Sequence, residues 1–494
     1  MARIQLLLFF SIHFLILQAQ SPGGLSAKDR LKSEIESLRN DSDMAHASWG
    51  ICVMAPGTQT EVIEFNSNLS LAPASTQKII TTAAGLSILG PHYCYKTVLE
   101  YTGSFDSIQG ILNGNLIIKG SGDPSLESFF FKSGKDSVQL TDKWADLLKA
   151  KNMNAISGSV IADASVFEDE TTESNWAWGD MENYYGAGAS GISYKDNMYS
   201  LFFNSGKSND SARLIRIVPE IPGFSILNYV KSAGTEDEAY IYGAPYSNSR
   251  YVSGTIPPHK SNFEVKGALP DPPFLLAYDL KKSLIRKGVS VKGQATSMRE
   301  LKLGAQCVSV RTKPLMEITS PSLEKIVYYT NMFSVNLFSE TILKTIALRK
   351  RGFGTAFGGI DELIGFWKSK GIDTRGMKLF DGCGLARANT VTPRQLTEIL
   401  CYMTKDASFQ SFYNSLPVAG KSGTMKGLLK GTSAENNLRA KSGSFNGVRS
   451  FAGYVNSKSG QQLAFAFIAN NFDCSSNEMR KKMERIMQLI AELD

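Results

Sequence analysis

Histidine is scarce in this chain of 494 residues, which contains only four. His13 lies in an apolar N-terminal segment, and His46, His92 and His259 stand outside the patterns G-x-S-x-G and H-E-x-x-H. The sequence therefore disfavours a Ser-His-Asp triad and a zinc hydrolase. Each of the last three histidines is interpreted as a surface or packing residue.

Cysteine is sparse as well, with six residues at positions 52, 94, 307, 383, 401 and 474. They are widely spaced and form no C-x-x-C pair, so zinc ligation is disfavoured and we predict neither a metal nor another cofactor. An oxidising compartment would permit disulfides, but a chain of this length does not need them. We expect free, buried thiols and leave any pairing open.

Long apolar runs are missing beyond the first twenty residues, so we predict no transmembrane anchor. The segment MARIQLLLFFSIHFLILQAQ carries a cation at Arg3, an apolar run from Ile4 to Leu17 and a small residue at Ala19. This pattern is typical of a secretory signal, here residues 1–20. We therefore expect export to the periplasm, without a lipid anchor because no cysteine follows the run.

Charge of one sign is not concentrated anywhere: the net charge of +7 comes from scattered basic residues. We therefore predict no nucleic-acid partner. A phosphate-binding loop is excluded as well, because SLPVAGKSG has Ser415 where the pattern G-x-x-x-x-G-K-[ST] needs its first glycine.

The order of the segments indicates two or more domains, as the length also does. A hairpin (WGICVMA, EVIEFN) and a helix (LAPASTQKIITTAAGLSILG) come first, and helices followed by strands occupy the last third. Short alternating strands fill the middle. We predict an α/β domain built from residues 21–96 and 307–494, with a β-rich insertion at 97–306.

The segment Ser75-Thr-Gln-Lys78 is a candidate for nucleophilic catalysis without histidine. Residues three apart at a helix start project from one face, and the helix N-terminus favours developing negative charge. A neutral Lys78 amine could take the Ser75 proton if its surroundings lowered a pKa of about 10.4. Ser322-Leu-Glu-Lys325 has the same spacing but lies inside a helical run and is interpreted as surface.

Three motifs together make a more specific pattern. Ser75-Thr-Gln-Lys78, Ser334-Val-Asn336 and a Lys-Ser-Gly follow one another in the order of S-x-x-K, S-x-N and K-[TS]-G. With them the chain resembles the serine penicillin-recognising enzymes. Two further S-x-N matches, at Ser444 and Ser475, come too late in the chain to be the second motif.

Lys-Ser-Gly occurs four times, beginning at Lys132, Lys421, Lys441 and Lys458. The family carries this motif on an edge strand beside the nucleophile, where an extended peptide can pair with it. Only Lys441 is followed by a hairpin signal, Asn446-Gly447, and by further strands. We therefore expect Lys441 to be the third motif's lysine.

The gap of roughly 260 residues between Ser75 and Ser334 narrows the resemblance to class C low-molecular-mass penicillin-binding proteins, the D-Ala-D-Ala carboxypeptidase and endopeptidase group. The stretches GSGDPSL, WAWGDMENYYGA, DGCGLARANTVTP and RAKSGSFNGVRSFAGYV agree with it. The resemblance implies a penicillin-binding/β-lactamase-like fold with helices on an antiparallel sheet. It also implies peptidoglycan stem peptides as substrates and acylation by β-lactams.

The resemblance further implies roles for single residues. The catalytic set is Ser75, Lys78, Ser334, Asn336 and Lys441; the substrate-binding set is Ser442, Gly443, Ser444, Asp163 and Arg387. Asp163 and Arg387 match positions that contact a diaminopimelate side chain, although a surface ion pair or a capping aspartate explains them equally well. Cys383 stands where the family usually has serine, and its role is left open.

Two other interpretations remain. One is a β-lactamase on the same fold, which the large insertion disfavours. The other is a non-catalytic wall-binding module with a decayed site, which the three intact motifs disfavour. Oligomeric state and the balance between carboxypeptidase and endopeptidase activity are left open.

Overall fold

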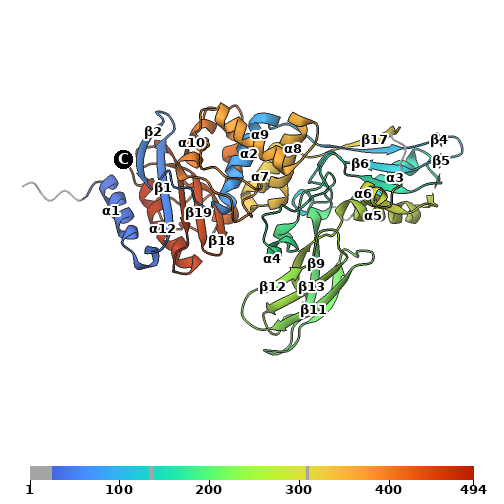
Figure 1. The fold of residues 1–494 in the computed structure, drawn as a ribbon, viewed down its shortest axis with the longest axis horizontal. Helices are drawn as coiled ribbons and strands as arrows, with labels where there is room; N and C mark the ends of the chain where they lie inside the picture. Colours follow the sequence, from blue (N-terminus) through green and yellow to red (C-terminus); the bar gives the residue numbers. More distant parts are fainter. Residues whose placement is uncertain (1–24, 133–137, 307–310) are drawn as a thin grey trace, which may run out of the picture.

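The computed structural model describes residues 25–132, 138–306 and 311–494 (Figure 1). The predicted signal at 1–20 lies outside them, as does Cys307. No helix of these three ranges is both long and apolar enough to cross a membrane. Cys52, Cys94, Cys383, Cys401 and Cys474 are free thiols, as expected, although Cys94 and Cys474 are only partly buried.

The main sheet joins the two ends of the chain. Its order is β18-β19-β20-β1-β2, and every neighbouring pair is antiparallel. The strands are β1 (Ser48–Ala55), β2 (Thr60–Phe65), β18 (Arg439–Phe445), β19 (Val448–Asn456) and β20 (Gln462–Asn470). β18 therefore forms one edge of the sheet.

Helices cover both faces of this sheet because its central strands are apolar on both sides (Figure 1). In β1, Ile51 and Val53 pack toward one layer, whereas Cys52 and Met54 pack toward the other. The first layer contains α1 (Ala27–Arg39) and α12 (Ser476–Ala491). The second contains α2 (Lys78–Leu89), α7 (Leu323–Phe333), α8 (Asn336–Arg351), α9 (Ala356–Ser369), α10 (Pro393–Met403) and α11 (Phe409–Ser415).

The middle of the chain contains further sheets with their own core. One has the order β16-β8-β6-β3-β17 and another β15-β7-β5-β4. The strands are β3 (Lys96–Tyr101), β4 (Ser104–Asp106), β5 (Ile111–Asn113), β6 (Leu116–Lys119), β7 (Ala155–Ile156), β8 (Val160–Asp163), β15 (Ser290–Val291), β16 (Ala295–Ser297) and β17 (Lys313–Thr319). The helices α3 (Leu140–Ala150), α5 (Pro272–Arg286) and α6 (Met298–Leu303) accompany them.

Two three-stranded sheets complete this part, β10-β9-β14 and β11-β13-β12. Their strands are β9 (Met198–Asn204), β10 (Arg213–Val218), β11 (Ser225–Ser232), β12 (Glu238–Tyr242), β13 (Ser249–Ile256) and β14 (Phe263–Ala268). The short helix α4 (Trp178–Met181) contacts β12. Figure 1 shows the sheet with β11, β12 and β13 in a lobe that projects from the molecule, with α4 at the end nearest the rest.

The domain limits at residues 97 and 306 stay predictions. The structure shows that β17, beyond 306, pairs with β3, whose first residue is Lys96. The region between them is also less purely β than its sequence texture indicates, because α3 and α5 contribute to its core. In α5, Asp271 caps the helix by accepting the amide of Phe274, and Pro272 follows at the first helical position.

Candidate active site

Ser75 lies in the 3₁₀ helix Ala74–Gln77, which leads directly into α2. The preceding residue, Ala74, has a left-handed backbone with φ of 47°, a costly conformation for a residue with a side chain. Two contacts hold this turn: the Ser450 hydroxyl donates to Pro73 O at 2.6 Å, and Gly384 packs against Ala74 O. A Cβ on Gly384 would lie 2.0 Å from that oxygen. The turn is therefore clamped between β19 and a loop distant in sequence.

Lys78 places its amine beside Ser75. The Nζ atom donates to Ser75 Oγ at 3.1 Å, to Asn336 Oδ1 at 2.6 Å and to Cys383 O at 2.8 Å. The residue has no exposed surface, and burial lowers the pKa of its amine. Within the described residues Lys78 forms no ion pair with a carboxylate. All three partners are neutral, so the pocket favours an uncharged amine.

Ser334 and Lys441 form a second hydrogen-bonded pair. Lys441 Nζ donates to Ser334 Oγ at 3.0 Å and to Ser442 O at 2.7 Å. Lys441 is fully buried, and its pKa lies well below the usual range because of burial and, second, the nearby Lys78. Ser334 ends α7 in a left-handed conformation with φ of 61°, and Asn336 begins α8. The sharp junction of the two helices thus presents both side chains of the second motif.

Strand β18 lies against the nucleophile. A Cβ on Gly443 would lie 2.8 Å from Ser75 N and 2.7 Å from Pro73 O, so only glycine permits this approach. Ser442 Oγ hydrogen-bonds Thr424 Oγ1 at 2.9 Å, and Ser444 is exposed. β18 is an edge strand of the main sheet, and it approaches the nucleophile at Gly443.

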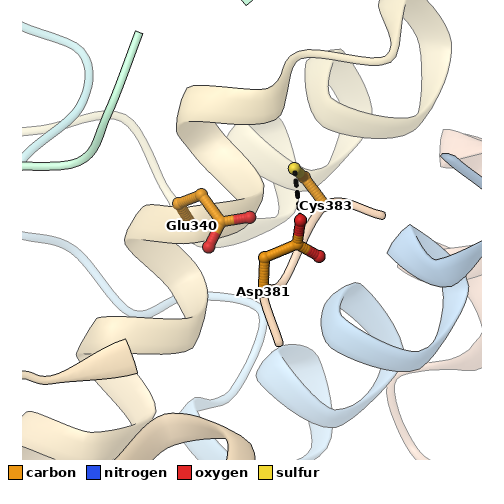
Figure 2. Close-up of side chains that lie close together, drawn as sticks. All are labelled: Glu340, Asp381 and Cys383. Atoms are coloured by element: carbon orange, nitrogen blue, oxygen red, sulfur yellow. Dashed lines mark hydrogen bonds between the residues drawn. The ribbon is translucent and has the colours of Figure 1, made fainter. Parts of the chain in front are cut away.

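The loop that carries Cys383 is fixed by two buried carboxylates, Glu340 and Asp381 (Figure 2). Both Glu340 oxygens accept the amide of Gly382, at 2.9 and 3.0 Å. Asp381 accepts the amides of Gly384 and Ala386 at 2.8 and 2.6 Å. The loop therefore holds the Cys383 carbonyl rigidly against Lys78.

Further side chains complete this buried cluster. Trp176 Nε1 donates to Asp381 at 2.9 Å, and the Cys383 sulfur lies 3.7 Å from the same carboxylate. Burial and the neighbouring Asp381 raise the pKa of Glu340, and burial raises the pKa of Cys383.

Glu340, Asp381 and Cys383 lie within reach of one common metal ion, but the carboxylate oxygens of Glu340 and Asp381 already accept backbone amides.

Sequence reasoning missed Glu340, and it included Asp381 only within the stretch DGCGLARANTVTP, without a role of its own. Glu340 follows Asn336 by four residues, and Lys344 follows by another four, so all three share one face of α8. All three are at least partly buried. The sequence therefore contained a signal for Glu340, namely the polar residues that recur at helical spacing after the S-x-N motif.

Asp163 and Arg387 form no ion pair with each other among the residues that the structure describes. Asp163 accepts the amide of Ser165 at 3.0 Å, as a local turn would require. Arg387 pairs with Asp180 at 3.5 Å and lies over the ring of Phe445. The acid beside this base is therefore Asp180, which sequence reasoning did not single out.

The competing copies of the motifs lie elsewhere. Lys421 is exposed in a turn, Lys132 pairs with Glu127, and Lys458 pairs with Asp494. Ser322 precedes α7 and Lys325 is exposed. Of the candidate lysines, only Lys78 and Lys441 point into the site.

A cleft of about 1270 Å³ opens beside the second motif. It is lined by Ser334 and Asn336 and extends along Tyr184, Tyr185 and Tyr240 of the middle region. Asn336 Nδ2 donates to Tyr185 O at 2.7 Å, which ties the cleft wall to the site. An extended ligand could therefore reach the site along this wall.

Known proteins share this architecture. The chain is 26% identical to the D-alanyl-D-alanine carboxypeptidase of Actinomadura sp. (strain R39) over 89% of its own length and 81% of that protein. It is 24% identical to D-alanyl-D-alanine carboxypeptidase DacB of Haemophilus influenzae, with 87% of each chain covered. The crystal structure of penicillin binding protein 4 (dacB) from Haemophilus influenzae superposes with a TM-score of 0.76 at 19% identity, covering 95% of this chain and all of the other.

The superposition confirms the predicted fold class. The family model for D-Ala-D-Ala carboxypeptidase 3 (S13) matches residues 31–493, which is nearly the whole chain. The resemblance seen in the motifs is thus confirmed over this length, and the chain belongs to the D-Ala-D-Ala carboxypeptidase 3 (S13) family of serine peptidases.

Proposed function

We propose that the protein removes the terminal D-alanine from peptidoglycan stem peptides through an acyl-enzyme on Ser75. The observation that carries the proposal is the buried Lys78 amine, 3.1 Å from Ser75 Oγ and surrounded by neutral partners. Such an amine can accept the hydroxyl proton as the oxygen attacks. Family membership supports the same reaction class.

In the first step Ser75 Oγ attacks the carbonyl of the penultimate D-alanine, and its proton passes to Lys78. The backbone N–H groups of Ser75 and Ser444 stabilise the oxyanion, which the approach of Gly443 to Ser75 N supports. Ser334, hydrogen-bonded to Lys441, relays the proton from Lys78 to the amine of the departing D-alanine, which returns Lys78 to its neutral form. Water then releases the shortened peptide and restores Ser75.

Substrate binding uses the edge of β18. The peptide pairs with the strand, and Lys441, Ser442 and Ser444 bind the terminal carboxylate. Asn336 holds a substrate amide. Arg387, which lies beside Phe445, and Asp163 contact the charged far end of the diaminopimelate side chain.

The proposal extends to the cellular location, the reaction with β-lactams and a second activity. The secretory pattern at residues 1–20 supports a periplasmic protein. β-Lactams enter the site as substrate mimics and remain as stable acyl-enzymes. An endopeptidase activity on cross-linked peptides is the second candidate, favoured by the roomy cleft beside Ser334.

The test compares wild type with Ser75→Ala and, as a matched control, Ser322→Ala from the second S-x-x-K copy. We expect wild type and the control to release D-alanine from a soluble peptide ending in D-Ala-D-Ala and to gain the mass of one penicillin. Ser75→Ala should do neither. Release by Ser75→Ala would refute the proposal, and rapid hydrolysis of penicillin without a stable adduct would favour a β-lactamase.

A further inference from the structure

The outward face of the sheet β11-β13-β12 is aromatic. This surface, which we call the aromatic face, consists of the side chains of Trp178, Leu227, Tyr229, Tyr240, Tyr242 and Tyr251. Tyr229 is 61% exposed and Trp178 is 54% exposed. Most exposed sheet faces are polar, so a group of rings there calls for a binding partner.

Strand register places these side chains together. Tyr251 of the central strand lies opposite Leu227 on one side and Tyr242 on the other. Ser253, two residues on, lies between Tyr229 and Tyr240. The opposite face is different in kind, because Val230, Ile241 and Val252 pack into the core of the middle region.

The rings contact one another and form a continuous strip. Tyr242 and Tyr251 stack with centroids 4.9 Å apart, Trp178 lies 5.2 Å from Tyr242, and Tyr229 lies 6.4 Å from Tyr251. The Trp178 indole is oriented by a hydrogen bond of 3.0 Å from its Nε1 to Gly243 O. The strip is therefore held in place before any ligand arrives.

The chemistry of the aromatic face suits a neutral polyol. Hydroxyl groups of Ser249, Ser253 and Thr255 alternate with the rings, and the only charges in these rows are Lys231 and Glu238, one on each side of Thr255. Leu227 is the only aliphatic member. Aromatic rings pack against the C–H faces of sugars while hydroxyl groups bond their rims.

The aromatic face also leads to the active site. Trp178 begins α4, and Tyr185 shortly after it accepts a hydrogen bond from Asn336 at 2.7 Å. Tyr240 lines the same cleft as Ser334. A polymer lying on the aromatic face could thus carry a side branch into the cleft.

We propose that the aromatic face binds the polysaccharide strand of the cell wall, a neutral chain of N-acetylated hexosamines, to which the cleaved peptides are attached. The choice of this polymer rests on the proposed function. In this arrangement the sugar strand anchors on the projecting lobe while its peptide branch reaches Ser75.

The test measures binding of chitohexaose, a β-1,4-linked hexamer of N-acetylglucosamine, by calorimetry. Tyr229→Ala combined with Tyr251→Ala should weaken its affinity at least about fivefold. Tyr229→Ala alone, at an exposed position, should weaken it in the same direction without a risk to folding. Phe357→Ala is the matched control, since Phe357 is 79% exposed on α9, away from the lobe.

Activity assays on two substrates distinguish a failure of sugar binding at the aromatic face from a failure of the proposed function. All variants should cleave a soluble peptide at the wild-type rate, whereas the tyrosine variants should release less D-alanine from intact peptidoglycan. Failure of wild type to cleave the soluble peptide would refute the proposed function, but chitohexaose binding would still test the aromatic face. Absence of chitohexaose binding to wild type, or equal binding by the tyrosine variants, would overturn the inference. Self-association of wild type that the double variant loses would also overturn it, because the occupant would then be a second copy.

Discussion

Two fully buried lysines, Lys78 on α2 and Lys344 on the neighbouring α8, have opposite surroundings. Lys344 Nζ lies 3.0 Å from Glu168 and 3.5 Å from Glu173, so two carboxylates compensate its charge. Lys78 meets only a hydroxyl, an amide oxygen and a main-chain carbonyl. The partners of a buried amine therefore decide whether it serves as a structural cation or as a base.

The carboxylates that could have compensated Lys78 are turned elsewhere. Glu340 accepts the amide of Gly382, and Asp381 accepts main-chain amides and the indole N–H of Trp176. They fix the loop rather than the amine. The pocket of Lys78 thus stays free of ion pairs although negative groups lie close by.

Lys78→Met should give the largest effect, because it removes the base and leaves no uncompensated charge. We expect the rate of penicillin acylation to fall about 10²–10⁴-fold while the fold persists. Intact-protein mass spectrometry of reactions quenched at successive times measures this acylation rate. Lys325→Met, from the exposed copy of the motif, should be acylated at the wild-type rate. Acylation of Lys78→Met at the wild-type rate would contradict the role of Lys78 as the base.

Lys344→Met should act on stability instead. Removal of this cation leaves the buried Glu173 and the partly buried Glu168 without their partner, and we expect a loss of about 3–5 kcal/mol in the free energy of unfolding. Urea denaturation measures the loss, and adding Glu173→Gln should restore part of it. The folded fraction should still be acylated at the wild-type rate. An unchanged stability would show that Lys344 is no structural cation.

Cys383→Ser should give the smallest effect. The main-chain carbonyl of this residue, not its side chain, meets Lys78, and a hydroxyl can keep the contact with Asp381. We expect stability within about 1 kcal/mol of wild type and an unchanged acylation rate. Thermal denaturation compares it with Cys401→Ser, whose sulfur has no hydrogen bond in the described residues and which should lose more. A slow Cys383→Ser would place the thiol in the mechanism.

Local patterns predicted the parts of the site that depend on short spacings. The helix after Ser75 ends at Gly90 as its sequence indicates, and the hairpin predicted at Asn446-Gly447 joins β18 to β19. Partners distant in sequence were not predictable in this way. Asp180 lies 207 residues from Arg387, and β17 pairs with a strand more than two hundred residues earlier. Packing across the fold decides such contacts.

The helix α5 shows a second limit of the sequence reading. Strands surround it in the chain, and the texture of the whole region was interpreted as β-rich. Its start signal, Asp271 followed by two prolines, was nevertheless present. Glu340 could likewise have been found from its helical spacing to Asn336, but its bond to Gly382 depends on a loop about forty residues later.

Acylation of Ser75 should depend on a neutral Lys78. Because burial lowers the pKa of Lys78, the acylation rate should rise with pH through one ionisation that lies below that of free lysine. Glu340 also titrates nearby, with a raised pKa, so the pH profile is measured for wild type and Glu340→Gln together. In the predicted result the ionisation persists in both proteins, and it lies at lower pH in Glu340→Gln because the Glu340 carboxylate raises the pKa of Lys78 in wild type. Its disappearance in Glu340→Gln, or a rate independent of pH in wild type, would contradict the assignment of Lys78 as the base.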